Sequence, residues 1–316
     1  ARIRSSDLLV GGVVLSNFTF DAAGCRGCRL GKTHRPPSLQ SSAPSRGGPR
    51  PHREDGMKRP STHGYTYFGQ RIDTDMSTTM PASWPHGFTV MTNFCDRYTA
   101  EFFLYFQVQA SAYEVAGALT EFERRCKHRL KDGVISRWHN DNDTAFDGPE
   151  VKAVAAELVD KHSRTVAHEK NRNPVSERNF GVLEGGLRAA HAFADAPLCL
   201  WPWGAYHLEC VLYYIETQAH QPPTSPYRFS QPDAGTANLS WVRAPIYCDV
   251  TVHLPPRDVM GKISPTGADG CYLGHDFKRN CEFVYLSGLR RLGSFVVTAW
   301  QPTSFTVCKS ITADTP

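Results

Sequence analysis

The chain has 316 residues, about twice the length of a typical single domain, so we expect two domains joined by a linker. Hydrophobic residues make up 41% and charged residues 21%, which allows a sizeable core and excludes a wholly disordered chain. No apolar run reaches the roughly 18 residues that a membrane-spanning helix needs, so no membrane partner is expected.

The formal net charge of +4 is distributed unevenly along the chain. Between Cys25 and Pro60, nine basic residues stand against only Glu54 and Asp55. Positive charge gathered in one segment is typical of an arm that holds nucleic acid.

Cysteine usage indicates a reducing compartment. Eight of the ten cysteines are scattered through apolar segments at no regular spacing, which predicts reduced, buried thiols in an intracellular protein. Only Cys25 and Cys28 form a C-x-x-C pair.

Two segments precede the globular part of the sequence. Residues 1–35 end in C-R-G-C-R-L-G-K-T-H-R, and we interpret their start as the cut end of a longer chain rather than a signal peptide. Residues 36–64 are rich in Pro, Ser, Gly and Arg and too poor in apolar residues to pack a core. They predict a flexible, basic linker.

A globular domain is predicted over residues 65–220, with strands and helices in alternation. A helix is expected at 112–130, for example, because apolar residues recur there at the spacing of one helical face. The predicted elements are strands at 68–76, 87–96 and 101–108, a helix at 112–130, a strand at 133–138, a helix at 149–162, a strand at 164–168, and helices at 173–196 and 204–219. This order predicts an α/β fold in which helices cover a mixed sheet.

The C-terminal third has a different pattern. A linker at 221–240 leads to residues 241–302, where apolar and polar residues alternate over 244–254 and short apolar runs follow between Gly-rich turns. Period-two alternation is typical of half-buried strands, so this region predicts a small β-barrel, followed by a tail at 303–316.

Three acidic residues have settings that suit catalysis. Asp75 ends the first predicted strand, Asp141 follows the fourth, and Glu177 lies in the first turn of a helix. Carboxylates from two strand ends and a crossing helix can converge on Mg²⁺ or Mn²⁺, which prefer hard oxygen ligands and can catalyse phosphodiester displacement in pairs. The alternative is that these are ordinary loop, turn and helix-terminal charges, because an Asp, Asp, Glu order arises by chance among 31 acidic residues.

Several motifs resemble those of one protein family and occur in the same order as in that family. The segments R-I-D-T-D-M-S-T-T-M-P, H-N-D-N-D-T-A-F and N-P-V-S-E-R-N-F-G are similar to the three catalytic motifs of the integrase region of copia-type LTR retrotransposon polyproteins, which carry a retroviral-type integrase. C-R-G-C-R-L-G-K-T-H-R-P-P resembles the end of the zinc-binding pre-integrase segment of that family, and R-A-P-I-Y-C-D-V-T-V-H-L-P resembles the start of its C-terminal barrel. The resemblance extends from Cys25 to about Trp300 and includes the 35 residues between Asp141 and Glu177.

The resemblance implies an RNase H-like catalytic core followed by an SH3-like barrel. It implies that Asp75, Asp141 and Glu177 bind two Mg²⁺ or Mn²⁺ ions for 3′-end processing and strand transfer into target DNA. Asp75 is preferred over Asp73 because the family motif places its Asp directly before an apolar residue, here Met76. Asp73 is the fallback.

Further expectations follow from the same resemblance. Cys25 and Cys28 offer half of a tetrahedral Zn²⁺ site, but residues 1–24 contain no His to complete it, so a free thiol pair is the default. DNA contacts are expected from Lys32, Arg35, Asn173 and Arg178. The protein is expected to be released from a polyprotein, to act in the nucleus, and to assemble as a homo-multimer on DNA.

Two departures from the family pattern keep other functions open. Asp143 stands where the family usually has Gly, and Ala145 stands where an acidic residue is usual. A catalytically degenerate DNA-binding remnant is therefore the main alternative, and a metal-dependent nuclease of the RNase H type is a third.

Overall fold

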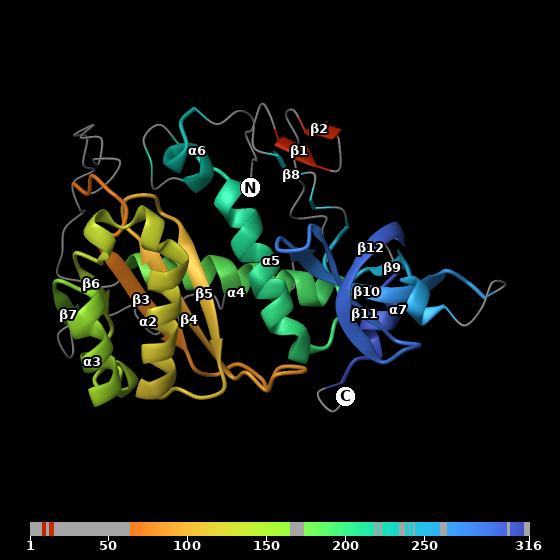
Figure 1. Cartoon of the computed structure of the whole chain (residues 1–316), viewed down its shortest axis with the longest axis horizontal. Helices are drawn as coiled ribbons and strands as arrows, with labels where there is room; N and C mark the ends of the chain where they lie inside the picture. Colours follow the sequence, from red (N-terminus) through yellow and green to blue (C-terminus); the bar gives the residue numbers. More distant parts are fainter. Residues whose placement is uncertain are drawn as a thin grey trace, which may run out of the picture.

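The computed structural model describes residues 8–10, 13–15, 64–164, 174–217, 220, 223–233, 238–239, 241–242, 244–259, 264–301 and 304–312. Two bodies dominate it, a helix-covered sheet and a β-barrel, and helix α5 (Trp201–Tyr214) lies between them (Figure 1). A short three-stranded sheet is separate from both and consists of β1 (Leu8–Val10), β2 (Val13–Leu15) and β8 (Asn238–Leu239). Among the described helices, none combines the length and apolar character needed to cross a membrane.

The main sheet has five strands in the order β5-β4-β3-β6-β7. These strands are β3 (Ile72–Ser77), β4 (Val90–Asp96), β5 (Phe102–Gln107), β6 (Trp138–Asn140) and β7 (His162–Arg164). The first three pair antiparallel, whereas β6 and β7 run parallel to β3. The strand predicted first along the sequence therefore lies at the centre, and the predicted mixed sheet is confirmed.

Helices cover both faces of this sheet. On one face, α2 (Ala112–Cys126) and α3 (Pro149–Leu158) pack against Ile72 and Phe94. On the other face, α4 (Pro174–Ala194) and α5 pack against Met91 and Leu104. Since successive strand residues alternate between faces, Asp73, Asp75 and Ser77 lie on the α4 face, opposite to that of Ile72.

Several element boundaries differ from the predictions. The strand expected at 133–138 lies at Trp138–Asn140, because Asp132 and Gly133 have positive φ and Ile135 makes only an isolated bridge to Val159. Helix α2 ends at Cys126, and the chain continues as a 3₁₀ turn over Lys127–Arg129. Helix α3 ends at Leu158, β7 covers only His162–Arg164, and α5 runs over Trp201–Tyr214 rather than 204–219.

The C-terminal region forms a closed four-stranded barrel. Its strands are β9 (Asp249–His253), β10 (Gly267–Asp276), β11 (Cys281–Leu286) and β12 (Arg291–Gln301), and β12 closes the barrel by pairing with β9. Two short helices, α6 (Pro226–Ser230) and α7 (Thr306–Lys309), flank it in sequence. A small barrel was predicted here, and its assignment to the SH3-like class stays a prediction.

Close contacts join the barrel to the helices. The Tyr247 hydroxyl is buried and lies 3.1 Å from the Leu200 carbonyl oxygen and 3.2 Å from His191 Nε2. A Cβ atom at Gly204 would collide with that hydroxyl, so α5 approaches the barrel only because residue 204 is glycine.

The outer edge of the sheet, strand β5, is tied to α5 by a carboxylate. Glu209 Oε2 accepts a hydrogen bond from the Leu104 backbone N–H at 3.3 Å, and Glu209 Oε1 pairs with Arg125 of α2 at 2.8 Å. Burial raises the pKa of Glu209, and the Arg125 charge opposes that rise. One buried side chain thus connects α5, β5 and α2.

Candidate functional site

The register of two parallel strands brings Asp75 and Asp141 together. Strands β3 and β6 pair Asp73 with His139 and Thr74 with Asn140. Asp75 and Asp141 are the next residues on each strand, so they lie side by side where the pairing ends, at an interstrand spacing of about 4.8 Å. Asp75 is half-buried and Asp141 is exposed, so a ligand can reach the point where the pairing of β3 with β6 ends, here called the β3–β6 seam.

Asp73 has a different environment, although it lies two residues before Asp75 on the same face. Its side chain is 0% exposed, and its two oxygens bind Arg71 Nε at 2.6 Å and Arg97 Nη1 at 2.7 Å. Two guanidinium groups therefore occupy the Asp73 carboxylate. This arrangement favours Asp75 as the cation ligand on β3.

Helix α4 lies over the same face of the sheet. Asn179 Nδ2 donates to Cys95 Sγ at 3.0 Å, and Ser77 Oγ donates to Glu184 Oε1 at 3.4 Å. Cys95 is the β4 partner of Asp73, so the helix advances from the level of Asp73 towards that of Ser77.

Glu177 lies in the first turns of α4, and its side chain is outside the described residues. Position 177 precedes position 184 by two helical turns, about 10 Å along the axis. Asn179 lies at the level of Asp73 and Glu184 at that of Ser77, so the helix backbone at 177, two residues before Asn179, lies near the level of Asp73. The catalytic role of Glu177 stays a prediction.

A hydrogen-bond chain fixes the backbone at Asp141. The buried Asn140 donates from Nδ2 to the Asp141 carbonyl oxygen at 2.6 Å, and its Oδ1 lies 2.6 Å from His162 Nε2. The His162 ring stacks on Trp138, with ring centroids 4.4 Å apart. Burial lowers the pKa of His162, so the ring is neutral at pH 7 and Nε2–H donates to the amide oxygen.

The site also contains buried polar atoms that sequence reasoning missed. Asn93 on β4 lies directly opposite Asp75, is 1% exposed, and its Oδ1 has no hydrogen-bond partner within the described part of the chain. Ser176, the residue before Glu177, is likewise buried, with an Oγ that finds no partner there. A single Asn inside the strand V-M-T-N-F-C-D gives no signal until the register places it beside Asp75.

The donor atoms at the seam suit a hard divalent cation. Asp75 and Asp141 contribute carboxylates, and Asn93 adds an amide oxygen with no partner among the described residues. This set of oxygens fits Mg²⁺ or Mn²⁺ and not a thiolate-seeking metal. Among the described residues, no group of three His, Cys, Asp or Glu side chains could hold a metal ion. Glu177, the third carboxylate of the predicted set, is not among the described side chains.

The other predicted site residues fall partly outside the described ranges. This applies to Cys25, Cys28, Lys32, Arg35 and Asn173. Arg178 is exposed on α4, where it can reach a phosphate or remain solvated. All eight described cysteines are free thiols, six of them buried.

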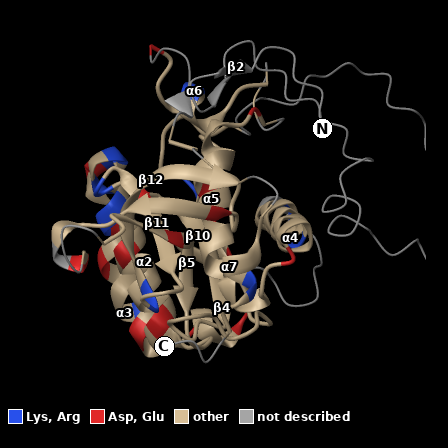
Figure 2. Ribbon diagram, turned by 90° about the vertical axis from the view of Figure 1, so that its right-hand side faces the viewer, with Lys and Arg blue, Asp and Glu red and all other residues tan. Residues whose placement is uncertain are grey.

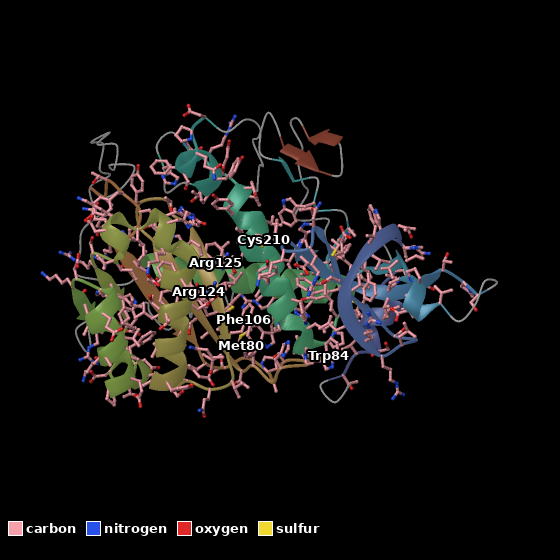
Figure 3. The ribbon with its side chains drawn as sticks, in the orientation of Figure 1. Met80, Trp84, Phe106, Arg124, Arg125 and Cys210 are labelled. Atoms are coloured by element: carbon pink, nitrogen blue, oxygen red, sulfur yellow. The ribbon has the colours of Figure 1, made fainter. Side chains whose placement is uncertain are left out.

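A cavity of about 880 Å³ lies elsewhere, between the sheet edge and the barrel. Figure 3 shows Arg124 and Arg125 of α2, Phe106 of β5 and Cys210 of α5 gathered at this place. Three acidic residues of its lining pair with three arginines of the same lining, Glu121 with Arg124, Glu209 with Arg125 and Asp276 with Arg279. Figure 2 shows acidic and basic residues intermixed along the ribbon of α2 and α3 as well, so this region offers no single-sign field for phosphates.

No protein-family model matches the sequence, and no curated protein matches it. Among solved structures, the chain is similar to the catalytic core domain of BIV integrase, with 14% identity and a TM-score of 0.37 over 51% of this chain and 92% of that one. It is also similar to a simian T-cell lymphotropic virus intasome in complex with the PP2A regulatory subunit B56 gamma, with 8% identity and a TM-score of 0.41 over 73% of this chain and 78% of that one. At these values, neither likeness assigns an activity to this chain.

Proposed function

We propose that the chain is the DNA integrase of a copia-type retrotransposon, a polynucleotidyl transferase and endonuclease with an RNase H-like core. The observation that carries this proposal is the parallel pairing of β3 with β6. It places Asp75 and Asp141, which are far apart in sequence, side by side at an open strand end beneath α4.

Asp75, Asp141 and Glu177 would hold Mg²⁺ or Mn²⁺, which when bound supplies charge neutralisation and activates oxygen for phosphodiester displacement. The chain itself supplies positioning. The β3–β6 ladder sets the spacing of the two Asp backbones, and the His162–Asn140 chain holds the Asp141 carbonyl. Preorganisation of this kind is the main protein contribution to phosphoryl transfer.

DNA is the partner that this chemistry requires. Arg178 is exposed on the same helix as Glu177 and is positioned to contact a phosphate, and the basic segment with Lys32 and Arg35 would add sequence-independent affinity, as would Asn173. Multimeric assembly on DNA ends, nuclear action and release from a polyprotein belong to the same proposal. Zn²⁺ binding at Cys25 and Cys28 would need ligands that residues 1–24 do not supply.

A catalytically degenerate DNA-binding remnant is the second candidate, and one observation favours it. Ala145, which replaces a usual acidic residue, is 5% exposed and belongs to the core cluster of Ile72 and Phe146. Asp143 caps the turn before it, because its Oδ1 accepts the Ala145 N–H at 2.8 Å. Ala145 thus packs in the core where the family usually has an acidic residue, and Asp143 caps the turn where the family usually has Gly.

A strand-transfer assay tests the proposal. Duplexes with randomised terminal bases are mixed with supercoiled plasmid and Mg²⁺ or Mn²⁺, and joined products are counted by sequencing, because the terminal sequence that the protein prefers is unknown. The wild type is expected to form joints and Asp141→Asn to form none. Asp143→Asn is the matched control, because Asn caps as well as Asp and should retain activity.

Two results separate the candidates. Equal joint formation by wild type and Asp141→Asn would overturn the proposed role of Asp141. DNA binding that is independent of Mg²⁺ and yields no joints would support the degenerate remnant.

A further inference from the structure

Asn93 is a buried polar residue on the apolar face that α4 covers. It lies between Met91 and Cys95 on β4, and Met91 packs with Phe180 and Leu183 of α4. On β5 its partner is Leu104, which belongs to the same apolar cluster. An amide thus occupies a position where an apolar residue would pack.

This amide carries a cost that the fold does not offset. Asn93 Oδ1 is buried and has no hydrogen-bond partner in the described ranges. An unsatisfied buried polar group costs about 1–3 kcal/mol, and an apolar group of similar shape would remove that cost. Orphaned polar atoms in folded proteins call for an explanation, and an absent ligand or ion is one such explanation.

Asn93 lies beside one of the proposed cation ligands. Directly opposed residues of an antiparallel pair have Cβ atoms about 4.5–5.5 Å apart, so the Asn93 amide neighbours the Asp75 carboxylate on the same face. Mg²⁺ keeps several of its waters when carboxylates bind it, and an amide oxygen accepts hydrogen bonds from water.

We propose that Asn93 is a positioning residue of the cation site, whose amide oxygen accepts a hydrogen bond from the hydration shell of the ion held by Asp75 and Asp141. This inference rests on the proposed function, and it adds an uncharged oxygen to the proposed cation site. An amide strengthens cation binding without the repulsion that a further carboxylate beside Asp75 would create in the empty site.

Mn²⁺ binding to the full chain without DNA tests this role. Free Mn²⁺ is counted by electron paramagnetic resonance during a titration, and stability without metal is measured by urea unfolding. Asn93→Leu is expected to raise the Mn²⁺ dissociation constant about tenfold, the lower end of the effect of groups that support metal ligands. The metal-free variant is expected to unfold at an equal or higher urea concentration, because the orphaned atom is gone.

A conservative variant and a matched control complete the design. Asn93→Asp keeps an oxygen acceptor and is expected to bind Mn²⁺ within about threefold of wild type. Tyr105→Phe removes a buried hydroxyl that, like Asn93 Oδ1, has no partner in the described chain. Tyr105 lies on the neighbouring strand but on the α2 face, where its ring packs on Phe94. It is expected to leave Mn²⁺ affinity unchanged.

Asp75→Asn separates the two proposals. If Asp75→Asn loses Mn²⁺ binding and Asn93→Leu binds within twofold of wild type, the role of Asn93 is overturned and the proposed function stands. If wild type binds no Mn²⁺, or binds it as well as Asp75→Asn, both are overturned. A metal-free Asn93→Leu that is less stable while its Mn²⁺ affinity is unchanged would assign Asn93 a structural role only.

Discussion

Two aspartates on one face of β3, Asp73 and Asp75, have opposite environments. At Asp73, neighbouring strands continue on both sides and two arginines close on the carboxylate, which is fully buried. At Asp75, the ladder to β6 has ended and the adjacent residue is the exposed Asp141. Burial between two arginines makes the first carboxylate a structural ion pair, whereas the second is half-buried and accepts the Met76 backbone N–H at 2.8 Å.

The two residues also differ in their neighbours on β6, because the β3–β6 ladder includes Asp73 and ends before Asp75. If β6 were extended by two residues, its ladder would cover Asp75 as it now covers Asp73. The short strand Trp138–Asn140 ends immediately before Asp141, the residue to which the proposed function gives a cation-binding role.

Substitution of Asp75 is expected to cause a greater loss of strand-transfer activity than the other substitutions. Asp75→Asn removes a proposed cation ligand and is expected to reduce strand transfer by a factor on the order of 10³. Its free energy of unfolding should stay close to that of wild type, as urea denaturation can measure. A stable variant with full activity would remove Asp75 from the site.

Substitution of the buried Asp73 is expected to lower the stability of the fold instead. Asp73→Asn leaves Arg71 and Arg97 without their counter-charge and should lower the free energy of unfolding by about 3 kcal/mol. Urea denaturation of Asp73→Asn beside Asp75→Asn gives the comparison directly. If Asp73→Asn were as stable as wild type but inactive, the two assignments would be exchanged.

His207 of α5 allows a test of how burial changes the pKa of a titratable group. Burial lowers the pKa of His207 from 6.5 to about 4. Below pH 6.5 the unfolded chain takes up a proton that the folded chain refuses, so the stability from neutral His207 is present above pH 6.5 and is lost as pH falls towards 4. His207→Leu, which cannot titrate, should lose about 2–3 kcal/mol less than wild type between pH 7 and pH 4 in urea unfolding. Parallel pH profiles for the two proteins would contradict this.

The smallest change in strand transfer is expected from the hydrogen bond between His162 and Asn140. His162→Ala removes the hydrogen bond that holds Asn140, and through it the Asp141 carbonyl, so strand transfer should fall about tenfold. His162→Gln offers a donor in place of Nε2–H and should restore part of that loss. A variant that loses stability but keeps its rate per folded molecule would show that the ring serves only to pack on Trp138.

Much of the architecture could be predicted from hydrophobic periodicity. The mixed sheet, its covering helices and a C-terminal barrel all follow from apolar spacing, whereas the RNase H-like and SH3-like assignments stay predictions. The strand β6 was misplaced because its apolar neighbours Val134 and Ile135 carry the strand-like pattern, while the residues that pair are the less apolar Trp138, His139 and Asn140.

The candidate site was predictable only where a motif marked it. Asp75 and Asp141 were chosen on the resemblance, and the register then placed them together. Asn93 and His162 could not be found in this way, because an Asn or His acquires its role from the strand opposite it and not from its neighbours in sequence.

The contact of Glu209 with Leu104 has a consequence for solubility. Strand β5 is an outer strand of the sheet, and a bare outer strand invites another chain to add to it. The Glu209 carboxylate occupies the Leu104 N–H, and Arg125 holds it in place. The Glu209–Arg125 pair thus hinders the addition of another strand at Leu104. The barrel needs no such device, because the pairing of β9 with β12 closes it.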